Sequence, residues 1–413
     1  MIKTTILTLI STLIKILSSL VINKTVSVYI GPSGLALIGQ FQNLLQIMMV
    51  VAQGGINNGI IKYTAEYRDD NNKLHSVWSA GAAILLSSSF IIGFISIVFS
   101  GFLSKTILKS DEYTYVFILL GVTVFLFSLN QFFLSIINGL KKINIFVFVN
   151  ISQSIYSLII TSLLIIFFRF DGALIALVTN QSIVFFVLMY KVWKIKEIEF
   201  SYFFSHFNNE SFAKLAKYSL MTFVSAMTMP AAIFYIRDYI GNNLSWNDAG
   251  YWQGMWYISS TYLMVVTTAL STYFLPRLSE LKSNEDIKKE FIQGYMVIIP
   301  LLICISFSIF LLKDFIVSFL FTHDFYPMVN LFKWQLIGDV IKMMSWLMSY
   351  FVLAKAMTKI YIASEFMFSL SFVLLSILFI NKYGLVGVTY GYFINYLFYL
   401  IFMLVITTKK LRC

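Results

Sequence analysis

Two lysines lie near the middle of long apolar stretches of the sequence. Lys15 falls about halfway along residues 5–29, and Lys342 falls about halfway along residues 329–355. An ionisable side chain at this depth in a bilayer is costly, and it usually faces a water-filled cavity or a partner of opposite charge. Either both lysines line an electropositive cavity that attracts phosphate, or each forms an ion pair within the protein. For Lys342 the candidate partner is Asp339, because residues three apart share a helix face.

Two further ionisable groups, Arg237 and Glu365, belong to other apolar stretches. Arg237 is interpreted either as a phosphate contact at the outer mouth of a cavity or as an anchor at the membrane interface. Glu365 lies about 10 Å into its stretch, at 1.5 Å per helical residue. Together with Asp339, it is a candidate for carrying a proton in a coupled cycle. The alternative for Glu365 is a simple ion pair with Lys355 or Lys359.

Amide side chains are unusually frequent in the second apolar stretch. Gln42, Gln46 and Gln53 fall close to one helix face, at intervals of four and seven residues. Amides both donate and accept hydrogen bonds, which suits sugar hydroxyls; Asn130 offers the same chemistry. The alternative is hydrogen bonding between helices, worth about 0.6 kcal/mol per contact. Trp334 is interpreted either as a surface on which a sugar stacks or as part of an interfacial aromatic belt.

The elements that must position these side chains are apolar helices. The chain has 413 residues, of which 59% are hydrophobic and 12% charged, and its mean hydropathy is +0.82. Continuous apolar runs favour transmembrane helices of about 20 residues over the alternating strands of a barrel. We therefore expect an all-α polytopic membrane protein. The twelve predicted spans are about 5–29, 37–62, 76–102, 113–138, 144–168, 172–194, 213–238, 247–275, 287–312, 329–355, 358–381 and 385–407.

The two sets of six spans resemble each other weakly. Tyr29-Ile30-Gly31 closes the first span, and Tyr239-Ile240-Gly241 closes the seventh, about 210 residues later. Because each set has an even number of spans, the two halves have the same orientation, as in a parallel repeat. Such a pair of bundles suggests alternating access to a cavity between them. The predicted parts are a first bundle at 1–195, a cytoplasmic linker at 196–212 that lies on the membrane surface, and a second bundle at 213–413.

Two prolines fall inside predicted spans. Pro230 lies within the seventh span and Pro300 within the ninth. Each removes a backbone hydrogen bond and is expected to kink its helix. The kinks are candidate hinges, although static kinks are also tolerated in membranes.

The distribution of basic residues predicts the topology. With a cytoplasmic N-terminus, about 20 lysines and arginines fall in the loops of that side and about seven on the other. Both termini are therefore expected in the cytoplasm. The net charge of +11 needs no nucleic-acid partner, because basic loops that face anionic headgroups account for it.

Catalytic and metal-binding patterns are missing from the sequence. The three histidines are scattered over predicted loops, and no His or Cys cluster has the spacing of metal ligands. No glycine-rich phosphate loop precedes a basic residue. A polymerase of lipid-linked sugars would carry a large outer loop, whereas the outer loops here are short. We therefore expect neither an enzyme nor a bound cofactor.

Several strings give the chain a family resemblance. Over nearly its full length it resembles bacterial polysaccharide repeat-unit flippases, a group that includes lipid III flippases and O-antigen translocases. These belong to the multidrug/oligosaccharidyl-lipid/polysaccharide (MOP) exporter superfamily. The resemblance is carried, in order, by residues 11–16 (STLIKI), 31–40 (GPSGLALIGQ), 58–67 (NGIIKYTAEY), 250–254 (GYWQG), 275–279 (LPRLS), 334–342 (WQLIGDVIK) and 354–365 (AKAMTKIYIASE).

This resemblance implies two six-helix bundles that move an undecaprenyl-pyrophosphate-linked oligosaccharide from the cytoplasmic to the periplasmic leaflet. A pyrophosphate needs cations, for which Lys15, Lys342 and Arg237 are the candidates. A sugar chain needs the amides and the tryptophan named above. The expected protein is a monomer among membrane lipids, with an O-antigen polymerase and a chain-length regulator as candidate partners. A multidrug or cation antiporter of the same superfamily remains the alternative, although it would want acidic residues in its cavity.

Overall fold

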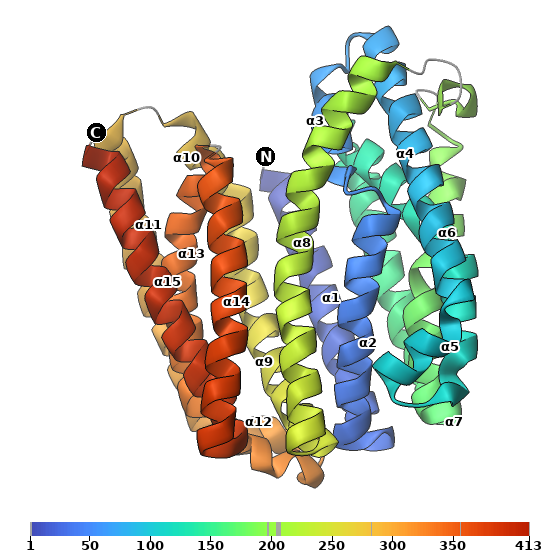
Figure 1. Cartoon of the computed structure of the whole chain (residues 1–413). Coiled ribbons are helices and arrows are strands. Elements are labelled where there is room, and N and C mark those ends of the chain that lie inside the picture. The colour runs from blue at the N-terminus through green and yellow to red at the C-terminus, as the bar shows by residue number, and fades with distance from the viewer. Residues whose placement is uncertain (1, 196–197, 204–207, 282, 356, 413) are drawn as a thin grey trace. The chain divides into compact units, whose positions relative to one another are not determined.

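The computed structural model of the chain describes residues 2–195, 198–203, 208–281, 283–355 and 357–412. Within these ranges the chain is almost entirely helical and contains no β-strand (Figure 1). The long helices of the first part are α1 (Ile2–Tyr29), α2 (Gly31–Ala52), α4 (Asn71–Val98), α6 (Thr114–Gly139) and α7 (Ile143–Val192). Those of the second part are α8 (Asn209–Asn243), α9 (Trp246–Ala269), α11 (Asn284–Leu311), α13 (Phe332–Ala354), α14 (Thr358–Tyr383) and α15 (Gly387–Arg412).

Short helical segments connect the long ones. The α-helical segments are α3 (Asn57–Glu66), α5 (Ser100–Leu103), α10 (Leu275–Glu280) and α12 (Lys313–Leu320). Two π-helical turns are η1 (Ser104–Leu108) and η4 (Leu270–Phe274). The 3-10 segments are η2 (Asp111–Tyr113), η3 (Phe200–Phe203), η5 (His323–Leu331) and η6 (Gly384–Val386).

The long helices account for the predicted spans. Helix α7 breaks at Arg169, where φ is 49° and ψ is −120°, so its 50 residues form two successive spans. With α7 counted as two, the described residues contain twelve long helical segments, and the prediction of a twelve-helix membrane protein is confirmed. Eight stretches of the described chain meet length and composition criteria for a membrane span, and two of them, Ile143–Val192 and Thr358–Leu411, have room for two crossings each.

The second predicted span, residues 37–62, is wrong as a single helix. Helix α2 begins earlier, at Gly31, and ends at Ala52. Gly54 and Gly55 then adopt φ values of +66° and +64°, which a residue with a side chain rarely tolerates. The chain resumes as the separate helix α3. Gln53 therefore lies at the end of α2, and it does not continue a stripe along one uninterrupted helix face.

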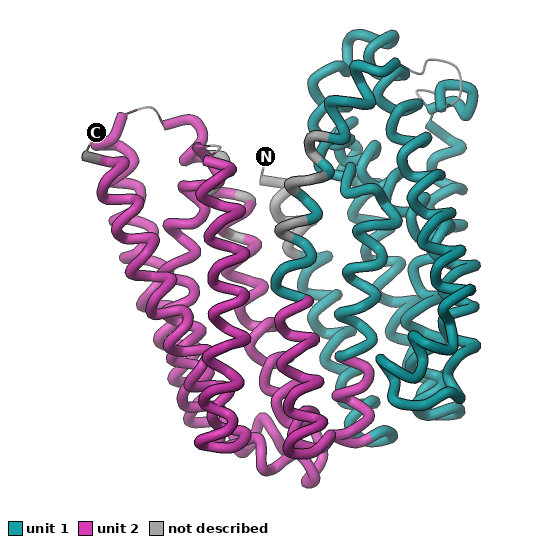
Figure 2. Tube along the Cα trace, in the orientation of Figure 1, with its two compact units in different colours: residues 1–30, 40–230 teal, residues 31–39, 231–413 magenta. Residues whose placement is uncertain are grey.

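The described residues form two compact units, shown in Figure 2. Unit 1 contains residues 1–30 and 40–230, and unit 2 contains residues 31–39 and 231–413. The chain therefore enters unit 2 briefly at residues 31–39, returns to unit 1, and passes to unit 2 for the rest of its length within α8, after Pro230. The predicted linker, residues 196–212, lies before this crossing. Its assignment as a linker between bundles stays a prediction.

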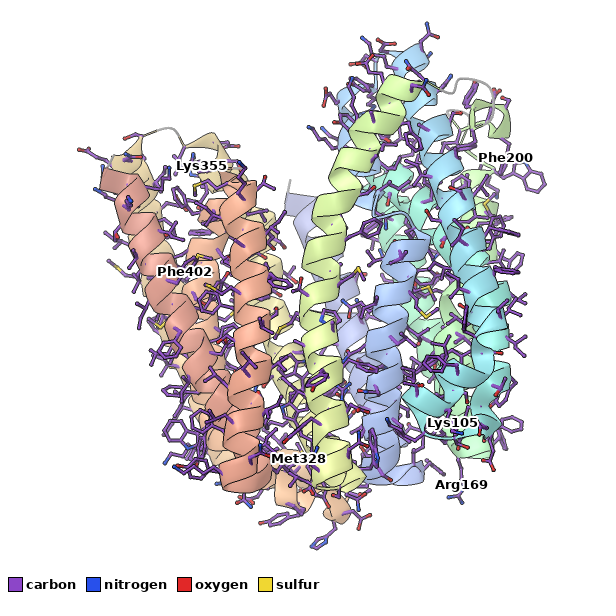
Figure 3. The ribbon with its side chains drawn as sticks, viewed as in Figure 1. Lys105, Arg169, Phe200, Met328, Lys355 and Phe402 are labelled. Carbon is purple, nitrogen blue, oxygen red and sulfur yellow. The ribbon has the colours of Figure 1, made fainter. Side chains whose placement is uncertain are left out.

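The described part of this segment packs into unit 1. Phe203 in η3 is 5% exposed, and its ring centroid lies 5.8 Å from those of Trp78 and Phe132. Phe200 is 46% exposed and lies toward one end of unit 1, opposite the end that carries Lys105 and Arg169 (Figure 3). The expectation that the whole segment lies on the membrane surface is therefore wrong for Phe203, because burial of its ring completes an aromatic cluster. Residues 196–197 and 204–207 lie outside the described residues.

Candidate functional site

Lys15 lines a polar cavity in unit 1. The cavity has a volume of about 470 Å³ and is formed by α1, α2 and both halves of α7. Among the described residues that line it, Lys15 is the only charged one, and Gln42 of α2 is among the amides there. None of the described residues forms an ion pair with Lys15, so no carboxylate in that part of the chain neutralises its charge. Lys15 therefore lines a cavity within unit 1, and its role as a phosphate contact stays a prediction.

The wall opposite α1 is built by the reversal of α7. The break at Arg169 folds the second half of the helix back along the first. Gly172 permits the close approach, since a Cβ atom there would lie 2.0 Å from the carbonyl oxygen of Leu164. As a result, Asn180 Nδ2 donates hydrogen bonds to Ser157 Oγ at 3.0 Å and to Thr161 Oγ1 at 2.9 Å. Hydroxyl and amide groups are thus held in fixed positions along the cavity.

The polar groups of α7 were missed by the sequence analysis, although a signal is present. Asn150, Gln153, Ser157 and Thr161 recur every three or four residues within an apolar helix, and all four line the cavity. This spacing places them on one helix face. An ammonium group beside such a stripe offers a cation for a phosphate group and hydrogen-bonding groups for a neighbouring polar ligand.

Three residues of unit 1 that were predicted to contact sugar do not line the Lys15 cavity. Gln46 is exposed on α2 but does not line the Lys15 cavity. Gln53 is 7% exposed, and its Oε1 accepts a hydrogen bond from the side chain of Asn57, which joins α2 to α3. Asn130 is fully buried in α6 and also lies outside the cavity lining. For Gln53 and Asn130 the structure contradicts a cavity-lining position, because both side chains are packed inside unit 1.

Lys342 lies in an aromatic cage within unit 2. Its ammonium nitrogen is between 5.0 and 5.7 Å from the centroids of four rings, which come from α9, α13 and α15. The four rings belong to Trp256, Trp346, Tyr392 and Tyr396. Ring faces attract a cation through their quadrupoles without neutralising it. The sequence analysis did not predict this cage, because its members lie on three helices.

Asp339 does not form the predicted direct lock with Lys342. No ion pair joins the two among the described residues. Instead, the carboxylate is fully buried and accepts hydrogen bonds from the hydroxyl groups of Tyr262 at 2.8 Å and Tyr392 at 2.7 Å. Tyr392 therefore connects the two groups, since its ring faces the ammonium and its hydroxyl group binds the carboxylate.

Glu365 lies near the same cage. The described residues contain no ion pair between Glu365 and either Lys355 or Lys359, so that alternative is wrong. Lys355 Nζ instead donates a hydrogen bond to the carbonyl oxygen of Leu281 at 2.5 Å. Glu365 is close enough to attract the ammonium of Lys342 electrostatically. Unit 2 thus places one cation, four rings and two carboxylates in one neighbourhood.

Arg237 and Trp334 take part in packing within unit 2. Arg237 is 1% exposed, its guanidinium donates a hydrogen bond to Gln253 Oε1, and it lies 5.7 Å from the centroid of Trp252. Such a position contradicts an open phosphate contact at the mouth of a cavity, because protein atoms cover the charge. Trp334 packs edge-on against Tyr390 and Phe393, with centroids 5.4 and 5.1 Å away. These contacts do not decide between sugar stacking and an interfacial belt, and both stay predictions for Trp334.

Comparison with known proteins relates the whole chain to transporters of polysaccharide precursors. Residues 1–282 match the family described as "Polysaccharide biosynthesis protein". The lipid III flippase of Escherichia coli (strain K12) is 30% identical over 406 residues, which cover 96% of this chain and 95% of that protein. A putative O-antigen transporter of Shigella flexneri is 24% identical over 259 residues, 60% of each chain.

A solved structure identifies the fold. The chain superimposes on the inward-facing conformation of a multidrug resistance MATE family transporter of the MOP superfamily with a TM-score of 0.82. The match covers 96% of this chain and 95% of the other, at 13% sequence identity. At this identity the likeness shows the fold alone. The predicted MOP fold is therefore confirmed independently of any shared substrate.

Proposed function

Because the chain belongs to the polysaccharide biosynthesis protein family, we propose that it is a flippase for an undecaprenyl-pyrophosphate-linked oligosaccharide. It moves this lipid from the cytoplasmic to the periplasmic leaflet of the bacterial inner membrane by alternating access. The observation that carries the proposal is the cavity of unit 1, where Lys15 is the only charged lining residue. A polar headgroup that is both anionic and rich in hydroxyls matches this lining.

The proposed contacts divide according to their chemistry. Lys15 binds the pyrophosphate, because its exposed ammonium forms no ion pair among the described residues and can make charge-assisted hydrogen bonds to phosphate oxygens. Gln42, Asn180 and the hydroxyl groups of α7 bind sugar hydroxyls through paired donors and acceptors. Lys342 is the second candidate cation, because its aromatic cage holds the ammonium in place and leaves its charge available. Arg237 and the buried amides Gln53 and Asn130 are not part of the proposed site.

The lining of the cavity favours this function over cation antiport. A cationic drug would need carboxylates, and like charges placed together cost several kcal/mol. The Lys15 cavity has no acidic residue in its lining. The structural likeness to a multidrug transporter therefore reflects the common fold.

The proposed setting in the membrane follows the distribution of basic residues. Both termini lie in the cytoplasm, and the protein acts as a monomer surrounded by lipids. In this proposed orientation the end of unit 2 that carries Lys355 faces the cytoplasm, and the opposite end, which carries Met328, faces the periplasm (Figure 3). An O-antigen polymerase and a chain-length regulator are the proposed protein partners, since both act on the translocated lipid.

The function is tested by complementation. The gene is introduced into strains that lack either an O-antigen flippase or a common-antigen flippase, and both glycans are scored in parallel. We expect one glycan to return to the cell surface, accompanied by a fall in the cytoplasmic pool of its lipid-linked repeat unit. Purified protein that transfers radiolabelled sugar into polymer would instead make it a polymerase. Restoration of neither glycan, with normal insertion, would exclude both proposed substrates.

Pro230 is the proposed hinge, and Pro300 is a second candidate within α11. Pro230 interrupts the hydrogen bonding of α8 at the residue where unit 1 ends. We expect Pro230→Ala to slow glycan delivery about threefold to tenfold while protein abundance changes less than twofold, because a restored hydrogen bond stiffens the helix. Pro300→Ala is the comparison, and we expect a smaller effect on delivery from it, since α11 lies entirely within unit 2. Equal effects of the two substitutions on delivery would remove the hinge role of Pro230.

A further inference from the structure

A second cavity, in unit 2, differs from the Lys15 cavity in being almost wholly apolar. It is a groove of about 450 Å³ between α11 and α13. Ile303, Phe307 and Phe310 of α11 face Ile337 and Val340 of α13. The floor is formed by Ser306 and Leu336, which are 6% and 3% exposed, whereas Phe307 is 60% exposed at the edge. The groove therefore opens on the outer surface of these two helices.

Two lysines flank one end of this groove. Lys333 is exposed and lines the groove beside Phe310. Lys313 Nζ lies 4.5 Å from the centroid of the Phe310 ring. Neither lysine forms an ion pair in the described part of the chain. Asp314, which follows Lys313 in the sequence, instead accepts a hydrogen bond from the hydroxyl group of Tyr326 at 2.8 Å. Two ammonium groups are thus available where the apolar lining ends.

The length and position of the groove match one leaflet of a bilayer. From Lys333 to Ile341 the helix α13 rises about 12 Å, at 1.5 Å per residue. Half of a hydrocarbon layer that is roughly 30 Å thick is about 15 Å. Trp334, beside Lys333, is a residue type that concentrates at the level of the headgroups. A lipid chain in the groove would therefore reach the middle of the membrane, with its headgroup at the two lysines.

We propose that this groove binds the chain of an isoprenoid diphosphate in the leaflet into which the flippase delivers it, with Lys313 and Lys333 on the diphosphate. This inference rests on the proposed function and adds a binding site for the product. A single groove between two helices suits one chain, and two ammonium groups suit a diphosphate. A common phospholipid has two chains and one phosphate, so it matches neither the single groove nor the two ammonium groups. The site holds the product after its headgroup has left the Lys15 cavity and before the lipid diffuses away.

The test uses the full-length protein in nanodiscs of neutral phosphatidylcholine. The probe is a sugar-free isoprenyl diphosphate with a photoreactive diazirine in its chain. We expect cross-links to peptides that contain residues 303–310 and 336–341. The double variant Lys313→Gln/Lys333→Gln should weaken binding of the probe about tenfold or more, since each basic residue near a membrane surface contributes severalfold to binding of an anionic lipid. The matched control is Lys382→Gln, because Lys382 is an exposed lysine of unit 2 that does not line the groove.

The possible results separate this site from the proposed function. Unchanged binding by the double variant, or cross-links confined to α1 and α7, would overturn the groove while leaving the flippase proposal intact. Preferential labelling of the groove by a photoreactive phosphatidylglycerol, with displacement of the isoprenyl probe, would also overturn it. If the probe cross-links to the groove as expected but complementation fails, the lipid-binding site is supported and the proposed glycan substrates are excluded. Because the lysines are at the surface, their replacement should not prevent folding.

Discussion

Replacement of Lys15 by alanine is expected to lower delivery of surface glycan by at least about 30-fold. The ammonium is the only charge that lines the cavity of unit 1, so its removal leaves the pyrophosphate without a cation there. Loss of one member of a buried charge pair costs about 2–5 kcal/mol. Since each 1.4 kcal/mol is about tenfold in rate, the lower bound corresponds to about 30-fold. The measurement is the amount of glycan at the cell surface in a strain whose own flippase gene is deleted.

Two further variants test whether transport requires the charge of Lys15 or only its packing in α1. Lys15→Arg keeps the positive charge and should retain a measurable part of the activity. Lys24→Ala removes another lysine from α1 that does not line the cavity, and it should leave delivery within about twofold of the parental level. Membrane abundance of each variant is measured by immunoblot. Normal glycan output from a stably inserted Lys15→Ala protein would remove this lysine from the site.

The sequence was sufficient to predict the fold class, for a physical reason. Long apolar runs have few alternatives in a membrane, because backbone groups without water must bond within a helix. A lysine in the middle of such a run has equally few alternatives, which is why Lys15 could be placed at a cavity. Gln42 lines the same cavity, whereas Gln46, which helix periodicity placed on the same face, does not.

The remainder of the candidate site depends on contacts that periodicity does not encode. The hydrogen bond between Tyr262 and Asp339 joins residues 77 positions apart, and the one between Tyr392 and Asp339 joins residues 53 apart. The hydroxyl wall of the Lys15 cavity exists because α7 reverses at Arg169, a residue that usually avoids a positive φ. The end of α2 likewise depends on the positive φ values of Gly54 and Gly55, which the continuous predicted span 37–62 did not anticipate.

Asp339 is expected to be more important for the stability of unit 2 than any other acidic residue described there. Replacement by alanine leaves the buried hydroxyl groups of Tyr262 and Tyr392 without this acceptor, and an unsatisfied buried group costs about 1–3 kcal/mol. It also removes a carboxylate that attracts Lys342. We expect Asp339→Ala to lower the apparent melting temperature of the purified protein by about 10 °C.

The conservative variant Asp339→Asn keeps a side-chain oxygen that can accept a hydrogen bond from a tyrosine hydroxyl, so it should recover about half of the lost stability.

Lys342→Gln tests whether Lys342 stabilises the fold or contributes to transport. If the caged lysine contacts substrate, Lys342→Gln should lower glycan delivery at least about tenfold while the melting temperature falls by only a few degrees. A parallel loss of melting temperature and delivery would show that Lys342 mainly supports the fold. A melting temperature of Asp339→Ala equal to that of the parental protein would contradict the proposed role of the two tyrosine bonds, because a buried acceptor cannot be removed without cost.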